Sequence, residues 1–412
     1  MIVIFGKGRV GNSVLSLCNY LKIEAILMDD GDYDEKVLIK ADTIIVSPGI
    51  PPFHKLYNEF KTKIQGELDF VYSIMNDDLK NNLNIVAVTG TDGKSTVCWM
   101  VYSLLRLVND HYNLGGKVWL GGNFDAPFSE ICESILANNL NNEKHYIAME
   151  ISSFMGFNIK NIQFDYSIWT NFQTDHLNWH NDMQDYFFSK SKVIENTKYH
   201  SYTNFEIIEK LNDISKVSPY EKVDLIGTKF HGEHNSFNLG ASLLVVKGIL
   251  IQNGIDISLS KLLELSKMIT PLEHRIQLVK EIQGVKIYDD GKSTSANSLN
   301  AALNSFEDKV ILIAGGSDKG DKFNHLSSSF VNKVAGAVLI GQTAQAFKDI
   351  FDELDIESTI ELSMESAVKK AFSLAKSRKI KTILFSPGCA SFGMFKNRLD
   401  RVQKFLHEVE QL

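Results

Sequence analysis

The chain has 412 residues, of which 44% are hydrophobic and 23% charged, a composition typical of folded globular proteins. Its net charge of −7, with acidic and basic residues interspersed, gives no basic face of the kind that nucleic-acid-binding proteins carry. The four cysteines are far apart and form no C-x-x-C pair, which argues against a zinc ribbon or a disulfide framework and favours buried thiols in a reducing compartment.

The N-terminal sequence MIVIFGKG predicts a strand, because it lacks the basic and long apolar regions of a signal peptide. The apolar run 240–252 is interrupted by Lys247 and is too short to span a membrane. We therefore expect a cytoplasmic monomer that binds small molecules and has neither a membrane nor a nucleic acid as partner.

Short β-branched runs alternate with amphipathic segments along the chain. The predicted strands are Ile2–Phe5, Thr43–Val46, Ile85–Thr89, Tyr146–Glu150, Tyr166–Thr170, Val285–Tyr288, Val310–Ala314, Gly336–Ile340 and Thr382–Ser386. Predicted helices between them include Gly11–Leu21, Ser95–Val108, Asn238–Ile251 and Ser366–Ser377. Strand–helix alternation predicts parallel sheets with helices on both faces. The polar segment Asn76–Asn84 and the pair Thr270–Pro271 are predicted linkers.

These boundaries predict an α/β protein with three domains. They are a Rossmann-like domain of residues 1–82, a central P-loop ATPase-type domain of residues 83–270 and a second Rossmann-like domain of residues 271–412.

The N-terminal segment GKGRVG fits G-x-G-x-x-G between a strand and a helix. Asp29 and Asp30 follow the second strand, where an acid can bond a ribose hydroxyl. The first interpretation of this motif is NAD binding in a dehydrogenase, and the competing one is that the same pocket holds the diphosphate of a nucleotide-linked substrate. The turn Ser47-Pro48-Gly49 lies at a strand end on the same sheet edge, and turn chemistry alone explains its proline as well as a ligand does.

The segment GTDGKST at residues 90–96 follows a strand and opens a helix. Its glycines let backbone N–H groups surround phosphate oxygens, Lys94 can reach the β- and γ-phosphates, and Ser95 can bind Mg²⁺. The usual first glycine of a Walker A loop is Val88 here, so the loop is a variant with Gly90 nearer Gly93. A Lys-Ser-Thr triplet has no packing reason to follow an ordinary glycine-rich turn, and we predict ATP binding.

Polar side chains follow the next strands of the same predicted sheet. Glu150 ends one strand, where it is placed to bind Mg²⁺ or is simply an exposed acid. Asp175 and His176 follow another strand, and we interpret the nearby His180 as structural. Lys190 sits in an apolar helical context, and its neighbours alone favour a lysine that snorkels to solvent.

In the third unit, the segments LEHR at 272–275, DDGKST at 289–294, GGSDKGD at 315–321 and SPGCASF at 386–392 carry cations and hydroxyl groups. Most of them follow predicted strands, so they lie at one edge of a doubly wound sheet, as in sites for anionic groups.

Together, the order and spacing of these motifs resemble the Mur ligase family over essentially the whole chain. The motifs are GKGRVG, SPGIP, VTGTDGKSTV, GGN at 121–123, MEISSF, TNFQTDHLNWH, YFFSKSKVI, GEHNSFN, LEHR, DDGKSTSAN, GGSDKGDKF and SPGCASFGMFKN. The chain departs from the pattern S-F-D-Q-F at Gly393-Met394, and the usual Arg-Gly after it is missing, although Arg398 and Arg401 are nearby.

The resemblance implies a role for each matching residue. The ATP site would comprise Gly90, Thr91, Asp92, Gly93, Lys94, Ser95, Thr96, Asn235, Asn238, Arg275, Asp290 and Lys292. The metal ligands would be Ser95, Glu150, His176 and Lys190, the last as a carbamate, with Lys192 the adjacent alternative. The UDP-linked substrate and the amino acid would contact Gly6, Gly8, Val10, Gly11, Asp29, Asp30, Ser47, Pro48, Gly49, Asn123, Ser152, Thr294, Lys319, Ser391 and Phe392. The catalytic residues would be Lys94, His176, Lys190, Arg275 and Lys292.

The resemblance also implies a reaction that uses ATP and two Mg²⁺ ions. The carboxylate of UDP-N-acetylmuramoyl-L-alanine would be phosphorylated, and the amine of D-glutamate would attack the acyl phosphate. Three alternatives stay open: a sister ligase for another amino acid, a non-catalytic ATP-binding scaffold, and a nicotinamide-dependent oxidoreductase. The last leaves residues 90–96 unexplained.

Overall fold

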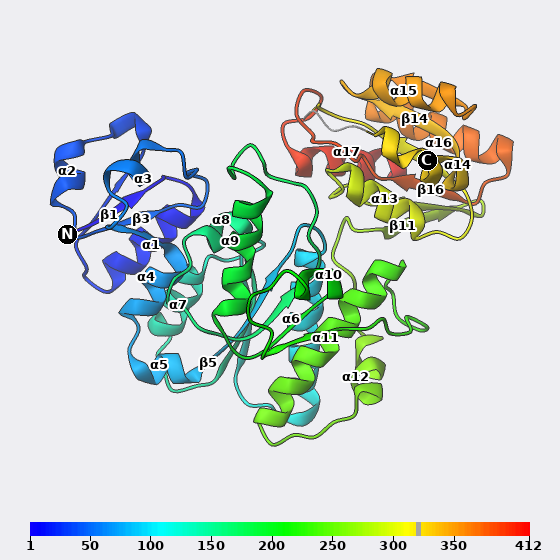
Figure 1. Cartoon of the computed structure of the whole chain (residues 1–412). Coiled ribbons are helices and arrows are strands. Elements are labelled where there is room, and N and C mark those ends of the chain that lie inside the picture. The colour runs from blue at the N-terminus through cyan, green and yellow to red at the C-terminus, as the bar shows by residue number, and fades with distance from the viewer. Residues whose placement is uncertain (319–322) are drawn as a thin grey trace. The chain divides into compact units, whose positions relative to one another are not determined.

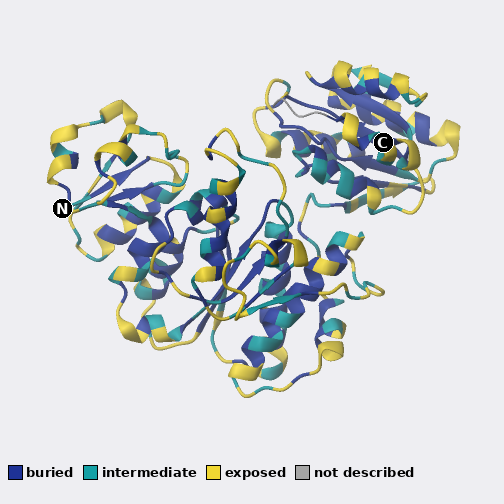
Figure 2. Ribbon diagram, in the orientation of Figure 1, coloured by how far each residue is buried: buried dark blue, intermediate teal, exposed yellow. Residues whose placement is uncertain are grey.

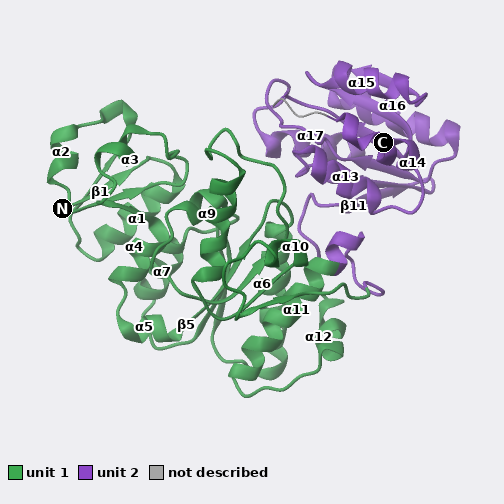
Figure 3. Ribbon diagram, in the orientation of Figure 1, with its two compact units in different colours: residues 1–224, 237–269 green, residues 225–236, 270–412 purple. Residues whose placement is uncertain are grey.

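The structure, a computed structural model, describes residues 1–318 and 323–412 and contains three β-sheets (Figure 1). It divides into two compact units (Figure 3). Unit 1 comprises residues 1–224 and 237–269, and unit 2 comprises residues 225–236 and 270–412. In both units the strands form the buried interior, and exposed residues lie on the helices and loops around them (Figure 2).

The first sheet of unit 1 is parallel and has the strand order β2-β1-β3-β4. Its strands are β1 (Ile2–Phe5), β2 (Ala25–Met28), β3 (Thr43–Val46) and β4 (Ile64–Gly66). The associated helices are α1 (Arg9–Tyr20), α2 (Glu35–Lys40), α3 (Lys55–Glu59), α4 (Glu67–Ile74) and α5 (Asp77–Asn82). Because all strands run the same way, the loops after β1, β2 and β3 emerge at one edge, where the N-terminal motifs lie.

The second sheet has the order β10-β9-β8-β5-β7-β6 and is also parallel. Its strands are β5 (Leu83–Thr89), β6 (Lys117–Gly122), β7 (His145–Glu150), β8 (Phe164–Trp169), β9 (Thr197–Thr203) and β10 (Val217–Pro219). Its helices are α6 (Lys94–Tyr112), α7 (Phe128–Ala137), α8 (Ser153–Phe157), α9 (Met183–Glu195), α10 (Phe205–Ile208), α11 (Glu233–Gln252) and α12 (Leu259–Ser266). The carboxyl ends of the neighbouring strands β5, β7 and β8 bring the loops at 90, 151 and 170 together.

The two sheets of unit 1 share one hydrophobic core, which includes Ile4 and Val14 from the first and Ile85 and Phe128 from the second. Two buried carboxylates on α4, Glu67 and Asp69, accept hydrogen bonds from segments that border the second sheet. Glu67 accepts hydrogen bonds from the backbone N–H and hydroxyl of Ser129, at 2.8 and 2.7 Å. The carboxylate thereby stabilises the N-terminal turn of α7, which has no side-chain cap of its own.

Unit 2 has one six-stranded sheet of order β11-β12-β16-β13-β14-β15. Its strands are β11 (Gln277–Ile282), β12 (Val285–Asp289), β13 (Val310–Ala314), β14 (Val334–Ile340), β15 (Ser358–Glu361) and β16 (Thr382–Phe385). Its helices are α13 (Ala296–Asn304), α14 (Ser327–Lys333), α15 (Ala344–Glu353), α16 (Met364–Arg378) and α17 (Arg398–Glu410). The strand β11, which the sequence did not predict, pairs antiparallel with β12, so this sheet is mixed, while its other strand pairs are parallel. A tight connection at Gln283-Gly284 joins these strands as a hairpin, and so short a connection allows only antiparallel pairing.

The α/β class is confirmed, and every predicted strand and helix forms, with small differences at the ends. The predicted linker Asn76–Asn84 is instead largely the helix α5, because Asn76 caps it by accepting from Leu79 N and two acids occupy its first turn. All four cysteines are buried free thiols, as predicted. Among the described residues, no helix has the length and apolarity that crossing a membrane requires.

Candidate active site

The loop between β5 and α6 has the backbone shape of a phosphate-binding loop. Gly90 has φ +145°, and a Cβ there would lie 1.9 Å from Thr170 Oγ1, so this position requires glycine. Lys94 begins α6, and its Nζ donates to the carbonyl oxygen of Thr91 at 2.6 Å. The N terminus of a 19-residue helix therefore opens directly beside a lysine amine, an arrangement that favours bound phosphate.

Side chains from the segment after β8 and from α9 hold this loop. Thr170 Oγ1 donates to Asp92 O at 2.6 Å, while Asn171 Oδ1 accepts from Asp92 N at 2.9 Å. The Tyr186 hydroxyl lies 3.1 Å from Thr91 Oγ1. These hydrogen bonds fix the shape of the loop.

Glu150 at the end of β7 connects two predicted site residues. Its Oε2 accepts from Ser95 Oγ at 2.6 Å, and its Oε1 accepts from Asn123 Nδ2 at 2.7 Å. The side chain is buried, so the reading of Glu150 as an exposed strand-end acid was wrong. Hard cations such as Mg²⁺ prefer oxygen ligands of this kind, and the Ser95–Glu150 pair fits such an ion at the edge of the phosphate loop.

Lys190 on α9 is almost completely buried, at 1% exposure, so the interpretation as a snorkelling lysine was wrong. Its Nζ donates to Gly90 O, in the phosphate loop, at 2.6 Å. Burial lowers the pKa of the Lys190 amine well below its usual value, and the charge of Lys94 lowers it further. Lys192 points elsewhere, because its Nζ donates to Phe157 O on α8.

His176 has a left-handed backbone, with φ +56°, which is uncommon for a residue with a side chain. Its Nε2 lies 3.4 Å from Asp175 Oδ2, and its ring packs edge-on against Phe154 with a centroid distance of 4.8 Å. Burial lowers the pKa of His176, which favours the neutral imidazole that metals bind. His180 is buried in the same aromatic group, in line with the structural role predicted for it.

The predicted adenosine contacts lie near the start of α11. The Asn238 side chain lies beside the phosphate loop, since a Cβ on Gly93 would be 3.3 Å from its Oδ1. Asn235 donates from Nδ2 to His231 O at 2.7 Å, and it falls in the segment that belongs to unit 2.

At the N-terminal motif, the glycines permit close approach of backbone segments. A Cβ on Gly11 would lie 1.9 Å from Gly6 O, so α1 packs directly on the loop after β1. Ser47 Oγ donates to Gly6 O at 3.1 Å and joins the two predicted substrate loops. The predicted contacts Gly6, Gly8, Val10, Gly11, Ser47, Pro48 and Gly49 therefore lie around adjacent strand ends.

The two acids after β2 already have partners within this domain. Asp29 caps a short 3₁₀ helix by accepting from Gly31 N at 2.9 Å and lies 3.7 Å from Lys7 Nζ. Asp30 Oδ1 lies 2.9 Å from His54 Nε2.

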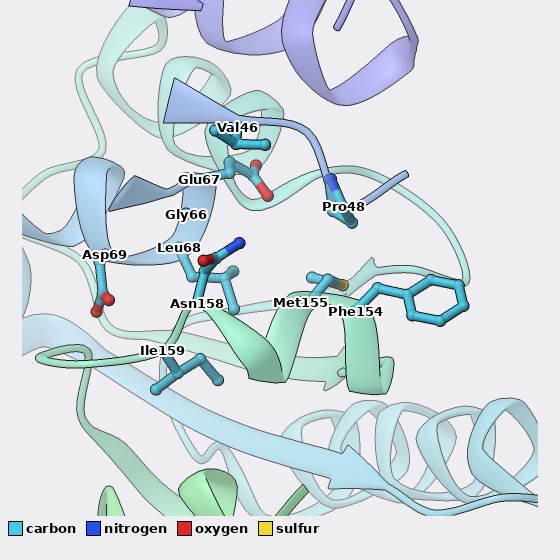
Figure 4. A pocket seen from close by; sticks show the side chains of 10 residues that line it. All are labelled: Val46, Pro48, Gly66, Glu67, Leu68, Asp69, Phe154, Met155, Asn158 and Ile159. Carbon is cyan, nitrogen blue, oxygen red and sulfur yellow. The ribbon is translucent and has the colours of Figure 1, made fainter. Parts of the chain in front are cut away.

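A small cavity lies between the edge of the first sheet and α8 (Figure 4). Pro48, from the predicted substrate loop, and Phe154 and Met155, just after Ser152, line it together with Glu67. Its volume of about 10 Å³ suffices for about one water. The Ser152 hydroxyl caps α8 by accepting from Met155 N at 3.2 Å. Two substrate segments predicted from distant motifs therefore face each other here.

In unit 2, Arg275 lies between two residues with left-handed backbone, His274 at φ +63° and Ile276 at φ +48°. Such strain in side-chain-bearing residues is typical of functional segments. Asp290 is buried, accepts from Ser386 Oγ at 2.7 Å, and has its pKa raised to about 7 by burial, against the effect of Ser386 and Arg275. Arg275 and Asp290 thus lie in one electrostatic cluster at the end of β12.

A larger cavity of about 550 Å³ lies at the same end of the unit 2 sheet. It is lined by His274, Lys292, Thr294, Ala390, Ser391, Phe392, Asn397, Arg398, Leu399 and Val402. Three of the predicted amino-acid contacts, Thr294, Ser391 and Phe392, therefore share one cavity with Lys292. Lys319, the fourth, lies outside the described residues.

Several residues at these sites escaped the sequence analysis. Asn171, Tyr186 and Thr170 lie within quoted motifs, but only the hydrogen bonds reveal that they hold the phosphate loop. Among the described residues, no group of three or more His, Cys, Asp or Glu side chains could hold a metal ion. A metal here would therefore need hydroxyl, phosphate or modified-lysine ligands in addition to Glu150 and His176.

Comparison with known proteins gives consistent matches. Residues 88–209 match the Mur ligase middle domain, and residues 274–389 match the Mur ligase glutamate ligase domain. A UDP-N-acetylmuramoylalanine–D-glutamate ligase of Aquifex aeolicus is 32% identical, with 99% of this chain and 98% of that protein covered. A protein of the same name from a Hydrogenobaculum species is 30% identical, with 98% and 97% covered.

Solved structures support the fold. MurF from Acinetobacter baumannii has a TM-score of 0.59 at 14% identity, with 81% of this chain and 78% of that chain covered. The UDP-N-acetylmuramate–alanine ligase MurC from Thermotoga maritima has a TM-score of 0.57 at 17% identity, with 100% and 99% covered.

Proposed function

The chain belongs to the Mur ligase family, and we propose from this premise that it joins D-glutamate to UDP-N-acetylmuramoyl-L-alanine at the expense of ATP. The products are the amide, ADP and phosphate, in a step of peptidoglycan precursor synthesis. The observation that carries the proposal is the buried amine of Lys190 on the carbonyl of Gly90, within a phosphate loop of a chain that matches D-glutamate ligases over nearly its full length. The matched proteins lend no support to a nicotinamide-dependent oxidoreductase.

The reaction has two displacements. A carboxylate oxygen of the UDP-linked substrate attacks the γ-phosphorus, the bond to the β-phosphate oxygen breaks, and ADP leaves. The amine of D-glutamate then attacks the acyl carbon, loses a proton, and expels phosphate. Both steps concentrate negative charge on phosphoryl oxygens, so charge neutralisation and positioning supply most of the catalysis.

We assign the phosphate contacts residue by residue from the family resemblance. Lys94 and the N–H groups of residues 90–96 would bind the β- and γ-phosphates, and Asn238, beside Gly93, supports an adenosine role for the start of α11 together with Asn235. Arg275, Asp290 and Lys292 would serve the transferred phosphoryl group. The three sheets support the division into domains at 1–82, 83–270 and 271–412.

Ser95 and Glu150 would hold one Mg²⁺, and His176 with a carbamate on Lys190 would hold a second. Bound Mg²⁺ would neutralise charge on the phosphates. The lowered pKa of Lys190 supports the carbamate, because only a neutral amine can attack CO₂, which then yields an anionic carbamate and a released proton.

The carbamate assignment is tested with Lys190→Ala and the matched variant Lys192→Ala, whose lost amine contacts Phe157 instead of the loop. We expect Lys190→Ala to abolish ligation and short carboxylic acids to restore part of it. Undiminished ligation by Lys190→Ala would contradict the carbamate role.

The function is tested by phosphate release from ATP with UDP-N-acetylmuramoyl-L-alanine and a panel of D- and L-amino acids. We expect release that requires both substrates and is fastest with D-glutamate. Fastest release with another amino acid would identify a sister ligase, and release in the absence of either substrate would contradict ligation.

A further inference from the structure

Glu67 is a buried carboxyl group that the proposed reaction does not use. It is the first residue of α4, directly after β4, and is 3% exposed. Its Oε1 accepts both hydrogen bonds from Ser129, whereas its Oε2 is buried and has no hydrogen-bond partner among the residues that the structure describes. A buried oxygen in this position costs free energy unless a proton and a water satisfy it.

The oxygen Oε1 of Glu67 connects to the helix of the N-terminal glycine motif. Ser129 Oγ uses its only hydrogen on Glu67 Oε1, so the hydrogen in the 2.7 Å contact between Ser129 Oγ and Ser13 Oγ must come from Ser13. Ser13 is buried on α1, two residues after Gly11, which packs directly against Gly6 O. The chain from Ser13 through Ser129 to Glu67 therefore holds the helix that begins at the predicted diphosphate motif.

Glu67 also lines the cavity of about 10 Å³ beside Pro48 (Figure 4). Asn158 supplies a second polar side chain to the lining, and it packs over the residue before Glu67, since a Cβ on Gly66 would lie 2.9 Å from Asn158 Cβ. Asn158 Nδ2 donates to the Tyr57 hydroxyl at 2.8 Å, which leaves the other N–H and the oxygen of the amide for a further partner. A buried water needs at least two polar partners, and Glu67 and Asn158 provide them.

The charged and titratable groups around Glu67 do not balance a negative charge on it. Among the described residues, none forms an ion pair with Glu67. On the neighbouring helices, Arg9 of α1 pairs with Glu130 of α7 at 3.3 Å, and burial, followed by the nearby Glu67, raises the pKa of the Cys132 thiol on α7. On α4 itself, Asp69 is a second buried acid. Burial raises the pKa of the Glu67 carboxyl group, despite the hydrogen bonds that it accepts, so the neutral acid persists to higher pH than in an exposed glutamate.

We propose that Glu67 is a positioning residue for the UDP-linked substrate, because it holds the helix of the diphosphate motif through Ser129 and the loop of Pro48 through one water bound at Oε2. This inference rests on the proposed function. Glu67 acts through these two segments and not through contact with the substrate. The phosphate loop has its own supports in Thr170 and Asn171, so loss of Glu67 should affect the UDP-linked substrate and leave ATP unaffected.

The test measures the KM values for UDP-N-acetylmuramoyl-L-alanine and for ATP in the phosphate-release assay. Glu67→Leu should raise the KM for the UDP-linked substrate by about 10-fold, the effect of about one lost hydrogen bond, and leave kcat and the KM for ATP unchanged. Ser129→Ala removes only the hydroxyl group of the chain to Ser13 and should raise the same KM by a smaller factor. Glu67→Gln keeps an acceptor oxygen for Ser129 and an N–H donor for the water, so its KM values should equal those of the unaltered protein.

Asp69→Asn is the matched control. Asp69 is also buried on α4 and also lines the cavity, but both of its oxygens already accept from the backbone N–H groups of residues 160–162. This variant should lose stability with no change in the KM for the UDP-linked substrate. Equal rises of both KM values in Glu67→Leu, no rise in either, or a rise in Glu67→Gln as large as in Glu67→Leu would overturn the inference. If Glu67→Leu does not fold, an unchanged KM in Ser129→Ala overturns it.

The water is tested separately by a crystal structure of the unaltered protein. Electron density for one water within hydrogen-bond distance of Glu67 Oε2 is expected, and a cavity without such density would overturn the link to the loop of Pro48. Failure of the unaltered protein to release phosphate with the UDP-linked substrate and D-glutamate would overturn the proposed function itself, which separates the two results.

Discussion

Substitution of Gly90 by alanine tests the shape of the phosphate loop. The backbone at φ +145° is strained for any other residue by roughly 1–3 kcal/mol. The new methyl group would also lie 1.9 Å from Thr170 Oγ1, which donates to Asp92 O, and displacement of such packed groups costs roughly 1–3 kcal/mol. We therefore expect a loss of roughly 2–6 kcal/mol in the free energy of unfolding, together with weaker ATP binding.

The measurement is urea unfolding followed by tryptophan fluorescence. All 4 tryptophans, Trp99, Trp119, Trp169 and Trp179, lie in the central region of unit 1, so the signal reports the part that contains the loop. Gly254→Ala is the matched control, because its φ is +72° but no atom lies within 4 Å of the added Cβ. It should lose only the backbone cost, roughly 1–3 kcal/mol. Equal losses in the two variants would refute the steric part of the reasoning.

Three further predictions concern charged groups. Lys94→Met should lower kcat by about 10²- to 10³-fold in the phosphate-release assay, while the free energy of unfolding in urea stays nearly unchanged. A kcat close to that of the unaltered protein would show that Lys94 does not stabilise the phosphates during the reaction. Asp290 has a folded-state pKa of about 7, raised from 3.8, so its protonated form stabilises the fold below about pH 4 and this contribution, about 4 kcal/mol at most, is lost as the pH rises to 7. As the pH rises from 4 to 7, Asp290→Asn should therefore gain stability relative to the unaltered protein, measured as the melting temperature in thermal unfolding. If the melting temperatures of the two proteins changed in parallel over this range, Asp290 would not be a buried group that titrates there. Asp69 is 1% exposed and accepts hydrogen bonds from the backbone N–H groups of Lys160, Asn161 and Ile162. Asp69→Ala should therefore lower the free energy of unfolding in urea by roughly 3–5 kcal/mol, and Asp69→Asn by clearly less. Equal losses in the two variants would show that the missing acceptor oxygens are not the cause.

The sequence predicted the strand and helix pattern well because each buried parallel strand is a short β-branched run followed by a glycine or a cap. The segments β4, β6, β9, β10, β11 and β15 were missed. Most of them lie at or near sheet edges, where partly exposed residues weaken the apolar signal. The antiparallel strand β11 belongs to this group, and its direction follows from the hairpin at Gly284.

The phosphate loop was predictable because its chemistry is local: Gly90, Lys94 and Ser95 lie within one short segment that needs only a strand before it and a helix that begins at Lys94. The environment of Lys190 was not. Its position in the sequence favours a snorkelling side chain, and only the packing of α9 against the loop after β5 buries its amine and places it on Gly90 O.

The sequence by itself determined the α/β class, the order of the motifs and the family, since these depend on residue types at fixed spacings. The tertiary structure alone decided which carboxylates are buried and which cations line one cavity. Such properties depend on the packing of residues far apart in the chain, as between Glu67 and Ser129 or around the cavity that Lys292 and Arg398 line. Burial and charge proximity, which set the pKa values and ligand preferences, exist only once those segments have met.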